Sequence, residues 1–138
     1  YFSFTRKYSE LEISKILIGY PKYFPVFSSC NAGMKIAALG KTRWCGNCPK
    51  CLFVYMSLYP FLKEKELLKI FGKDIFNPST SSGREKLLAI MKGLLGQGRP
   101  KPFECVGTYE ESRGAFALCL QKAQKERSIP YLLTLRKK

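Results

Sequence analysis

The chain has 138 residues, of which 46% are hydrophobic and 14% aromatic, enough to bury the core of one domain. This composition excludes an intrinsically disordered protein, and no apolar stretch reaches the ~20 residues of a membrane-spanning helix, so no membrane partner is expected. The 24 basic and 10 acidic residues give a net charge of +14. Such an excess favours a polyanionic partner, although a solvated basic surface would also account for it.

The apolar residues 1–5 predict a short buried strand. Ligands gather at the C-terminal ends of strands in open α/β sheets, so Thr5 and Arg6 are a candidate anion site. A solvated arginine after a strand is an equally good interpretation. The chain opens on this stretch without a methionine or a secretory signal pattern. We therefore predict a single domain over residues 1–138 that is the C-terminal portion of a longer chain.

An amphipathic helix and a long loop should follow the strand. Ser9 and Glu12 form a capping box, and apolar side chains then recur at helical spacing, namely Ile13, Ile16, Leu17 and Tyr20. Two prolines end this helix before an extended piece at Val26 and Phe27. Residues 28–42 have the glycine punctuation of a loop.

Four cysteines lie in a metal-ligand pattern within residues 30–51. Cys45, Cys48 and Cys51 are separated by two residues each, and Cys30 lies upstream. A short turn at this spacing lets each thiol face one ion, and the chain contains no histidine. The pattern predicts a structural Zn²⁺ site of four thiolates in a reducing cytosol rather than disulfides. An iron–sulfur cluster is the alternative.

A buried central helix should begin at this metal site. Residues 51–62 are apolar on nearly every side, and Pro49 suits a first helical turn because its missing N–H costs nothing there. Metal site and core should therefore form together. Beside the cysteines, Arg43 and Trp44 either contact a phosphate or a base, or simply cover the metal.

Two further helices are predicted after the central one. Residues 63–71 form an amphipathic helix that Gly72 ends. A capping box of Ser82 and Glu85 begins the next helix, which ends before Gly96.

The last helix and a final strand complete the prediction. Thr108 and Glu111 form a capping box, and one face of the helix carries the apolar stripe Phe116, Cys119, Leu120 and Ala123. Residues 129–135 indicate a short strand. The fold class is therefore mainly α with a little β, stapled by a four-cysteine zinc site.

Candidate chemistry outside the cysteine cluster lies around the start of the last helix. Cys105 lies among Arg99, Lys101 and Glu104, a few residues before the helix N-terminus, and both cations and a helix N-terminus lower the pKa of a thiol. A small buried residue under a loop is the competing interpretation. Glu111 and Arg113 are either substrate contacts or ordinary residues of a helix start.

Taken together, the motifs resemble a known family. The run Arg43 to Cys51, the run Lys-Pro-Phe-Glu-Cys-Val-Gly at residues 101–107 and Glu-Glu-Ser-Arg at 110–113 look like the C-terminal part of a UDP-N-acetylmuramoyl-L-alanyl-L-glutamate epimerase of the MurL type. This family resembles other PP-loop ATP pyrophosphatases, including the 7-cyano-7-deazaguanine synthases with their four-cysteine zinc site. The resemblance covers residues 1–117, and the 101–107 run is the most diagnostic.

The resemblance implies a cytoplasmic, ATP-dependent isomerase of peptidoglycan precursor synthesis, which belongs to cell-wall assembly. It would activate the terminal L-Glu of UDP-MurNAc-L-Ala-L-Glu as an acyl-adenylate, exchange the acidified α-proton and release the D-Glu product by hydrolysis. Cys105 and Glu104 are the candidates for proton transfer. The candidate substrate contacts are Thr5, Arg6, Arg43, Lys101, Glu111 and Arg113.

One element of the superfamily is missing from these residues. Its phosphate loop, a Ser-Gly-Gly-x-Asp-Ser segment, does not occur in the sequence. The chain should therefore depend on an N-terminal PP-loop half to bind ATP and Mg²⁺.

Two other functions fit the residues. A basic zinc module would bind nucleic acid, with Trp44 and the tyrosines as stacking platforms. An enzyme like the deazaguanine synthases would instead act on a purine-like base.

Overall fold

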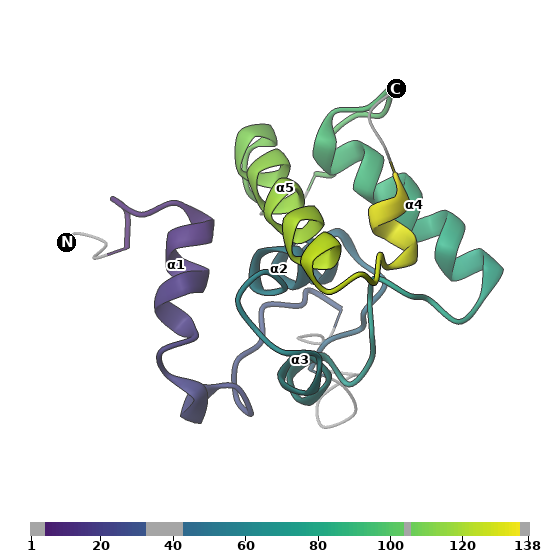
Figure 1. Cartoon of the computed structure of the whole chain (residues 1–138). Helices are drawn as coiled ribbons and strands as arrows, with labels where there is room; N and C mark the ends of the chain where they lie inside the picture. The colour runs from purple at the N-terminus through teal and green to yellow at the C-terminus, as the bar shows by residue number, and fades with distance from the viewer. Residues whose placement is uncertain (1–4, 33–42, 104–105, 136–138) are drawn as a thin grey trace.

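A computed structural model describes residues 5–32, 43–103 and 106–135, and within these ranges the chain is helical and contains no strand. The helices pack around one that runs through the middle (Figure 1). In chain order the elements are α1 (Glu10–Leu17), η1 (Pro21–Tyr23), α2 (Pro49–Leu58), α3 (Glu64–Phe71), α4 (Ser81–Leu95), α5 (Tyr109–Lys125) and η3 (Tyr131–Thr134).

Helix α2 is the centre of the core, as predicted, although it ends at Leu58 rather than at residue 62. It packs against α1, α3, α4 and α5. Its buried residues are Cys51, Leu52, Phe53, Tyr55, Met56, Ser57 and Leu58. Each large apolar side chain buried in this way contributes about 1.5–3 kcal/mol. The helix begins at Pro49 and carries a cysteine in its first turn, so the cysteine cluster and the core share one element.

The ends of the helices follow local rules that the sequence already carries. Ser9 and Thr108 each accept a hydrogen bond from the backbone three residues on, in complete capping boxes, as predicted. Gly72 and Gly96 end α3 and α4 in the left-handed conformation, with φ of 72° and 70°. The predicted capping box of Ser82 and Glu85 is wrong, because Thr80 caps α4 by accepting from the Gly83 N–H.

The predicted final strand is wrong. Residues 131–134 form the short helix η3, in which both Leu132 and Leu133 are buried. The Leu132 N–H donates to the Phe76 carbonyl and the Leu133 N–H to that of Pro130. An isolated strand would leave its backbone groups without partners, whereas this turn finds acceptors at Pro130 and at Phe76 in the segment after α3.

The two other predicted extended segments also differ from the structure. Of the predicted strand at 1–5, residues 1–4 lie outside the described ranges, and Thr5 is in a turn that the Tyr8 N–H closes. Val26 is likewise in a turn, since its N–H donates to the Tyr23 carbonyl.

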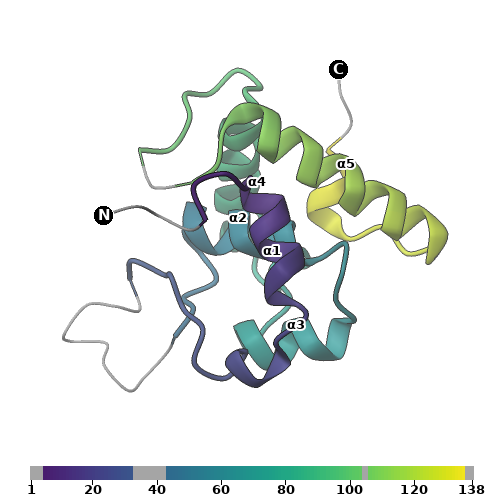
Figure 2. The ribbon, with the colours of Figure 1, turned by 90° about the vertical axis from the view of Figure 1, so that its left-hand side faces the viewer.

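Helix α1 lies on the flank of the molecule (Figures 1 and 2). It packs against α2 and α5 with a narrow face that includes Leu11, Leu17 and buried Ser14. Two members of the predicted inner stripe, Ile16 and Tyr20, are exposed instead. A helix of eight residues that meets its neighbours along one side can bury only part of its apolar surface.

A polar network joins α2 to the segments that follow α3 and α5. The Tyr55 hydroxyl donates to Asp74 Oδ1 over 2.9 Å, and Asp74 also accepts from the Phe76 N–H and from the Asn77 amide. Asn77 Oδ1 in turn accepts from the Tyr131 N–H over 2.8 Å. Burial raises the pKa of Tyr55, which keeps its hydroxyl protonated as a donor.

Replacing Asp74 by alanine should therefore lower the free energy of unfolding by about 1–3 kcal/mol, because it leaves the Tyr55 hydroxyl and the Phe76 N–H without their acceptor. The measurement is urea denaturation followed by circular dichroism. Tyr55→Phe is the matched comparison and should cost less, since Asp74 then keeps its two other donors. Equal losses for both variants would contradict this account of the network.

Candidate functional site

The four predicted metal-ligand cysteines come together in the structure. Their sulfur atoms all lie within 4.8 Å of one another. The Sγ atoms of Cys30 and Cys48 are 4.0 Å apart, those of Cys45 and Cys51 3.7 Å, and those of Cys48 and Cys51 3.4 Å. Cys30 and Cys51 are fully buried, whereas the other two are partly exposed. Three segments therefore converge on one small site: the loop after η1, the turn before α2 and the first turn of α2.

Backbone N–H groups surround these sulfurs. The N–H groups of Cys45, Gly46, Asn47 and Cys51 each point at a cysteine sulfur, with N···S distances of 3.4 Å. Gly46 makes the tight turn with a φ of 70°, and a β-carbon there would lie 2.6 Å from Lys73 Cδ. Donors directed at sulfur stabilise its charged form, so the turn is built to hold thiolates.

The thiols affect one another's ionisation. Contact with Cys51 lowers the pKa of Cys48 to about 5, and the same contact raises the pKa of Cys51. Burial raises the pKa of Cys45. Cys48 thus forms a thiolate readily whereas the raised pKa values of Cys45 and Cys51 favour their protonated forms, and four thiolates together require the charge of a cation. The thiol ligands, their spacing and the N–H groups directed at the sulfurs all fit a bound metal ion.

Trp44 joins the cluster to the hydrophobic core. Its ring packs between those of Phe27 and Phe71, at centroid distances of 5.2 and 4.8 Å, and its Nε1–H donates to the Phe27 carbonyl over 3.1 Å. Only 3% of the residue is exposed. Trp44 is therefore a covering residue and has no free face on which a base could stack. Arg43, by contrast, is exposed.

The N-termini of α1 and α5 meet at one edge of the domain. Glu111 joins them, since its Oε1 accepts from the Glu10 N–H over 2.9 Å and its Oε2 from the Thr108 N–H over 2.8 Å. The turn that carries Thr5 and Arg6 directly precedes α1 and is thereby held near the start of α5. Glu111, predicted to contact substrate, has both carboxylate oxygens in hydrogen bonds that join two helices.

Arg113 also holds helices together. Its Nε–H donates to the Leu95 carbonyl at the end of α4 over 3.0 Å, and its guanidinium lies 5.7 Å from the centre of the Tyr109 ring. The C-terminal end of α4 is thus fastened to the first turns of α5.

The diagnostic loop at 101–107 is braced at both ends. The Lys101 N–H donates to the Tyr109 hydroxyl over 3.2 Å, and Gly93 of α4 lies so close to Pro100 that a β-carbon would come within 2.9 Å of its carbonyl oxygen. At the other end, a β-carbon on Gly107 would lie 2.8 Å from Glu111 Oε2 and 2.9 Å from Phe53 Cε2. Glu104 and Cys105, the predicted proton-transfer residues, lie between these braces but outside the described residues.

The segments with the predicted substrate residues share one side of the molecule. The turn before α1, the loop before α2 and the loop before α5 all lie towards the left in Figure 2. The cysteine cluster is not part of the predicted chemistry at this edge, although it anchors one of the three segments.

Residues 26–138 match the sequence pattern of a protein family described as the MurL C-terminal domain. The chain belongs to this family. Three curated relatives are each called UDP-N-acetyl-alpha-D-muramoyl-L-alanyl-L-glutamate epimerase. No solved structure matches the chain.

The relatives come from different bacteria. The one from Micromonospora sp. (strain ATCC 39149 / NRRL 15099 / SCC 1413) is 38% identical over 124 residues, 90% of this chain and 26% of the relative. The protein from Salinispora tropica is 40% identical over 119 residues, 86% of this chain and 24% of the relative. The protein from Xanthomonas oryzae pv. oryzae is 38% identical over 125 residues, 90% of this chain and 26% of the relative. This MurL C-terminal domain thus spans about a quarter of their length.

Gly107→Ala is a direct test of the bracing of the diagnostic loop in this MurL C-terminal domain. The added methyl group has no room between Phe53 and Glu111, so we expect a loss of about 1–3 kcal/mol in unfolding free energy, measured by chemical denaturation. Gly114→Ala is the matched control, because its β-carbon would meet Leu11 at an ordinary 3.6 Å. Equal stability of the two variants would show that Gly107 is not a close-packing position.

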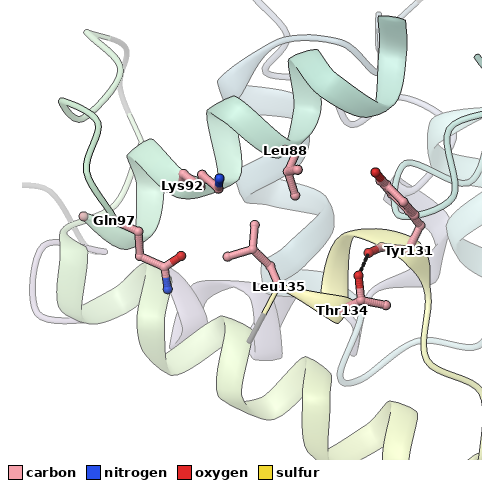
Figure 3. A pocket seen from close by; sticks show the side chains of 7 residues that line it. Leu88, Lys92, Gln97, Tyr131, Thr134 and Leu135 are labelled. Atoms are coloured by element: carbon pink, nitrogen blue, oxygen red, sulfur yellow. Dashed lines mark hydrogen bonds between the residues drawn. The ribbon is translucent and has the colours of Figure 1, made fainter. Parts of the chain in front are cut away.

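A pocket that the sequence did not predict lies between α4 and η3 (Figure 3). It has a volume of about 640 Å³ and is lined by Leu88, Lys92, Gly96, Gln97, Tyr131, Thr134 and Leu135. The Thr134 hydroxyl donates to the Tyr131 carbonyl over 2.7 Å, and the Arg84 guanidinium lies 5.2 Å from the centre of the Tyr131 ring. None of the predicted site residues lines this pocket, and its residues form no sequence motif.

Within residues 5–32, 43–103 and 106–135, no helix is both long enough and apolar enough to cross a membrane.

Proposed function

We propose that this chain is part of an ATP-dependent epimerase that inverts the terminal L-Glu of UDP-MurNAc-L-Ala-L-Glu in peptidoglycan precursor synthesis. The observation that carries the proposal is 38–40% identity, over 86–90% of the chain, with relatives named for this epimerisation. The chain corresponds to about a quarter of each relative, so the remainder of a full-length enzyme supplies the other parts of the active site. Reduced cysteines fit a cytoplasmic location.

The cysteine cluster is proposed to hold a structural Zn²⁺. A tetrahedral zinc ion with Zn–S distances of ~2.3 Å places its sulfurs about 3.8 Å apart, and three of the sulfur pairs here are 3.4–4.0 Å apart. Four thiolates leave no open position for a substrate, so the ion serves folding. An iron–sulfur cluster is the alternative occupant, and its visible absorption would distinguish it from zinc.

The shared edge of the domain is proposed to face the substrates. Arg6, Arg43 and Lys101 supply cationic side chains from three segments on this side of the molecule, and the N-terminal ends of α1 and α5 favour negative charge. ATP and a nucleotide-sugar are polyanions, which agrees with the net charge of +14. The phosphate loop and the Mg²⁺ site are assigned to the rest of the enzyme, in line with the proposed PP-loop superfamily and its 7-cyano-7-deazaguanine synthases.

The chemistry requires activation before proton exchange. The α-carboxylate of the terminal glutamate attacks the α-phosphorus of ATP, which forms an acyl-adenylate and releases pyrophosphate. The adjacent α-hydrogen is then acidic enough for a base to remove it from one face and for an acid to return a proton to the other. Water hydrolyses the acyl-adenylate and releases AMP and the D-Glu product. Cys105 and Glu104 are the proposed proton-transfer pair.

The test uses the full-length, metal-loaded protein. With ATP and UDP-MurNAc-L-Ala-L-Glu it should yield the D-Glu epimer, with one AMP and one pyrophosphate for each turnover and one solvent deuteron at the α-carbon in D₂O. Chiral analysis of the hydrolysed product and mass spectrometry measure both quantities. A folded protein that forms neither epimer nor AMP would refute the proposed function.

A further inference from the structure

Four large apolar side chains along α1, η1 and the adjoining turns are exposed to solvent. Ile16, Tyr20, Tyr23 and Val26 are 47%, 52%, 48% and 71% exposed, and together we call them the outer α1 face. The ring centroids of Tyr20 and Tyr23 lie 6.3 Å apart. A group of exposed apolar side chains within a single stretch of eleven residues is unusual on a free surface and marks an interaction site.

The backbone beneath this face is ordered by hydrogen bonds. The Tyr23 N–H donates to the Tyr20 carbonyl, and the N–H groups of Val26 and Phe27 both donate to the Tyr23 carbonyl. The Phe27 carbonyl then accepts from Trp44, the covering residue beside the cysteine cluster. The outer α1 face is thus presented by a fixed turn that the core and the cluster hold in place.

We infer that the outer α1 face is the surface against which the rest of the full-length epimerase packs. This inference rests on the proposed function. About three quarters of each relative lies outside the region that this chain matches, and that part must contact the domain if both contribute to one active site. Helix α1 has eight residues and is therefore about 12 Å long, so a body seated on this face also reaches the substrate edge at the other end of the helix.

Charge favours this occupant over a second copy of the chain. Lys15 and Lys22 border the face, with the Lys22 ammonium 5.1 Å from the centre of the Tyr23 ring. A symmetric pair of these domains would bring the same lysines together at a net charge of +14 for each copy. A partner surface that is apolar at its centre and acidic at its rim avoids this repulsion.

Hydroxyl-radical footprinting of the full-length protein tests the inference. Tyr131 is the internal reference, since it is only 38% exposed in this domain. We expect Tyr20 and Tyr23 to be oxidised several-fold more slowly than Tyr131. In this domain alone Tyr20 is the most exposed of the three tyrosines and Tyr131 the least. If their oxidation rates in the full-length protein follow this order, the inference is wrong. If Tyr20 and Tyr23 are protected only at high protein concentration, where the protein has the mass of a dimer, a second copy covers the outer α1 face and the inference is wrong.

A pair of variants adds a second measurement. In the full-length protein, the double substitution Tyr20→Ser and Val26→Ser should lower the melting temperature and restore oxidation of Tyr23. Ile129→Ser is the matched control, because Ile129 is also 47% exposed but lies outside the outer α1 face. A melting temperature and a Tyr23 oxidation rate equal to those of the control would overturn the inference. Neither readout needs turnover, so footprint protection in a protein without epimerase activity would refute the proposed function alone.

Discussion

Replacing Cys48 by serine is expected to abolish binding of the proposed metal ion and to unfold the domain. Cys48 caps α2, lies 3.4 Å from the Cys51 sulfur and 4.0 Å from that of Cys30, and so belongs to both the cluster and the central helix. Apparent binding free energies of structural zinc sites are about 10–16 kcal/mol, which is as large as the whole stability of a typical domain. Metal content by elemental analysis and helicity by circular dichroism should be lost together.

Cys119→Ser is the control for the Cys48 variant. Cys119 is a buried thiol outside the cluster that donates to the Met56 carbonyl, a bond that a serine hydroxyl can also make. This variant should keep the metal and remain folded. A Cys48→Ser protein that retains both metal and helicity would show that the cluster does not stabilise the fold.

Cys105→Ser and Glu104→Gln are each expected to lower epimerase turnover by about 10²–10⁴-fold in the full-length protein, because a positioned acid or base contributes that much. The melting temperature should not change, since neither side chain is needed for the braces at Gly93 and Gly107. Product formation and uptake of solvent deuterium at the α-carbon are the two measurements. If the two residues serve opposite faces of the α-carbon, one variant should still exchange the proton of the L-epimer without inverting it.

Gln97→Ala is the control for these two variants, as it changes the segment between α4 and α5 without removing a group proposed to transfer protons. It should keep most of the turnover. Full activity in both the Cys105 and the Glu104 variants would assign proton transfer to residues elsewhere in the enzyme.

Several local features of this domain follow from short segments of sequence. The capping boxes at Ser9 and Thr108 and the glycines that end α3 and α4 depend on contacts within about four residues, which the order of side chains already specifies. The two-residue spacing of Cys45, Cys48 and Cys51 likewise restricts these thiols to one turn. The sequence pattern therefore predicted both the helix ends and the cluster.

Other features depended on which surfaces were available for packing. The apolar residues 129–135 suit a strand or a buried turn equally well. The turn forms because it lets the Leu132 N–H donate to the Phe76 carbonyl. Ile16 and Tyr20 belong to the predicted helical stripe but are exposed, because α1 ends at Leu17 and meets α2 and α5 along only one side.

The sequence by itself determined the four-cysteine cluster, the central helix that begins within it and most helix ends, because these rest on local geometry and on the hydrophobicity of side chains. Only the tertiary structure decided that Trp44 is buried beside the cluster and that Glu111 joins the starts of α1 and α5 across 101 residues of sequence. It also decided that the outer α1 face remains uncovered in this domain. These outcomes depend on contacts between distant segments, whose free energies arise only when the helices pack around α2.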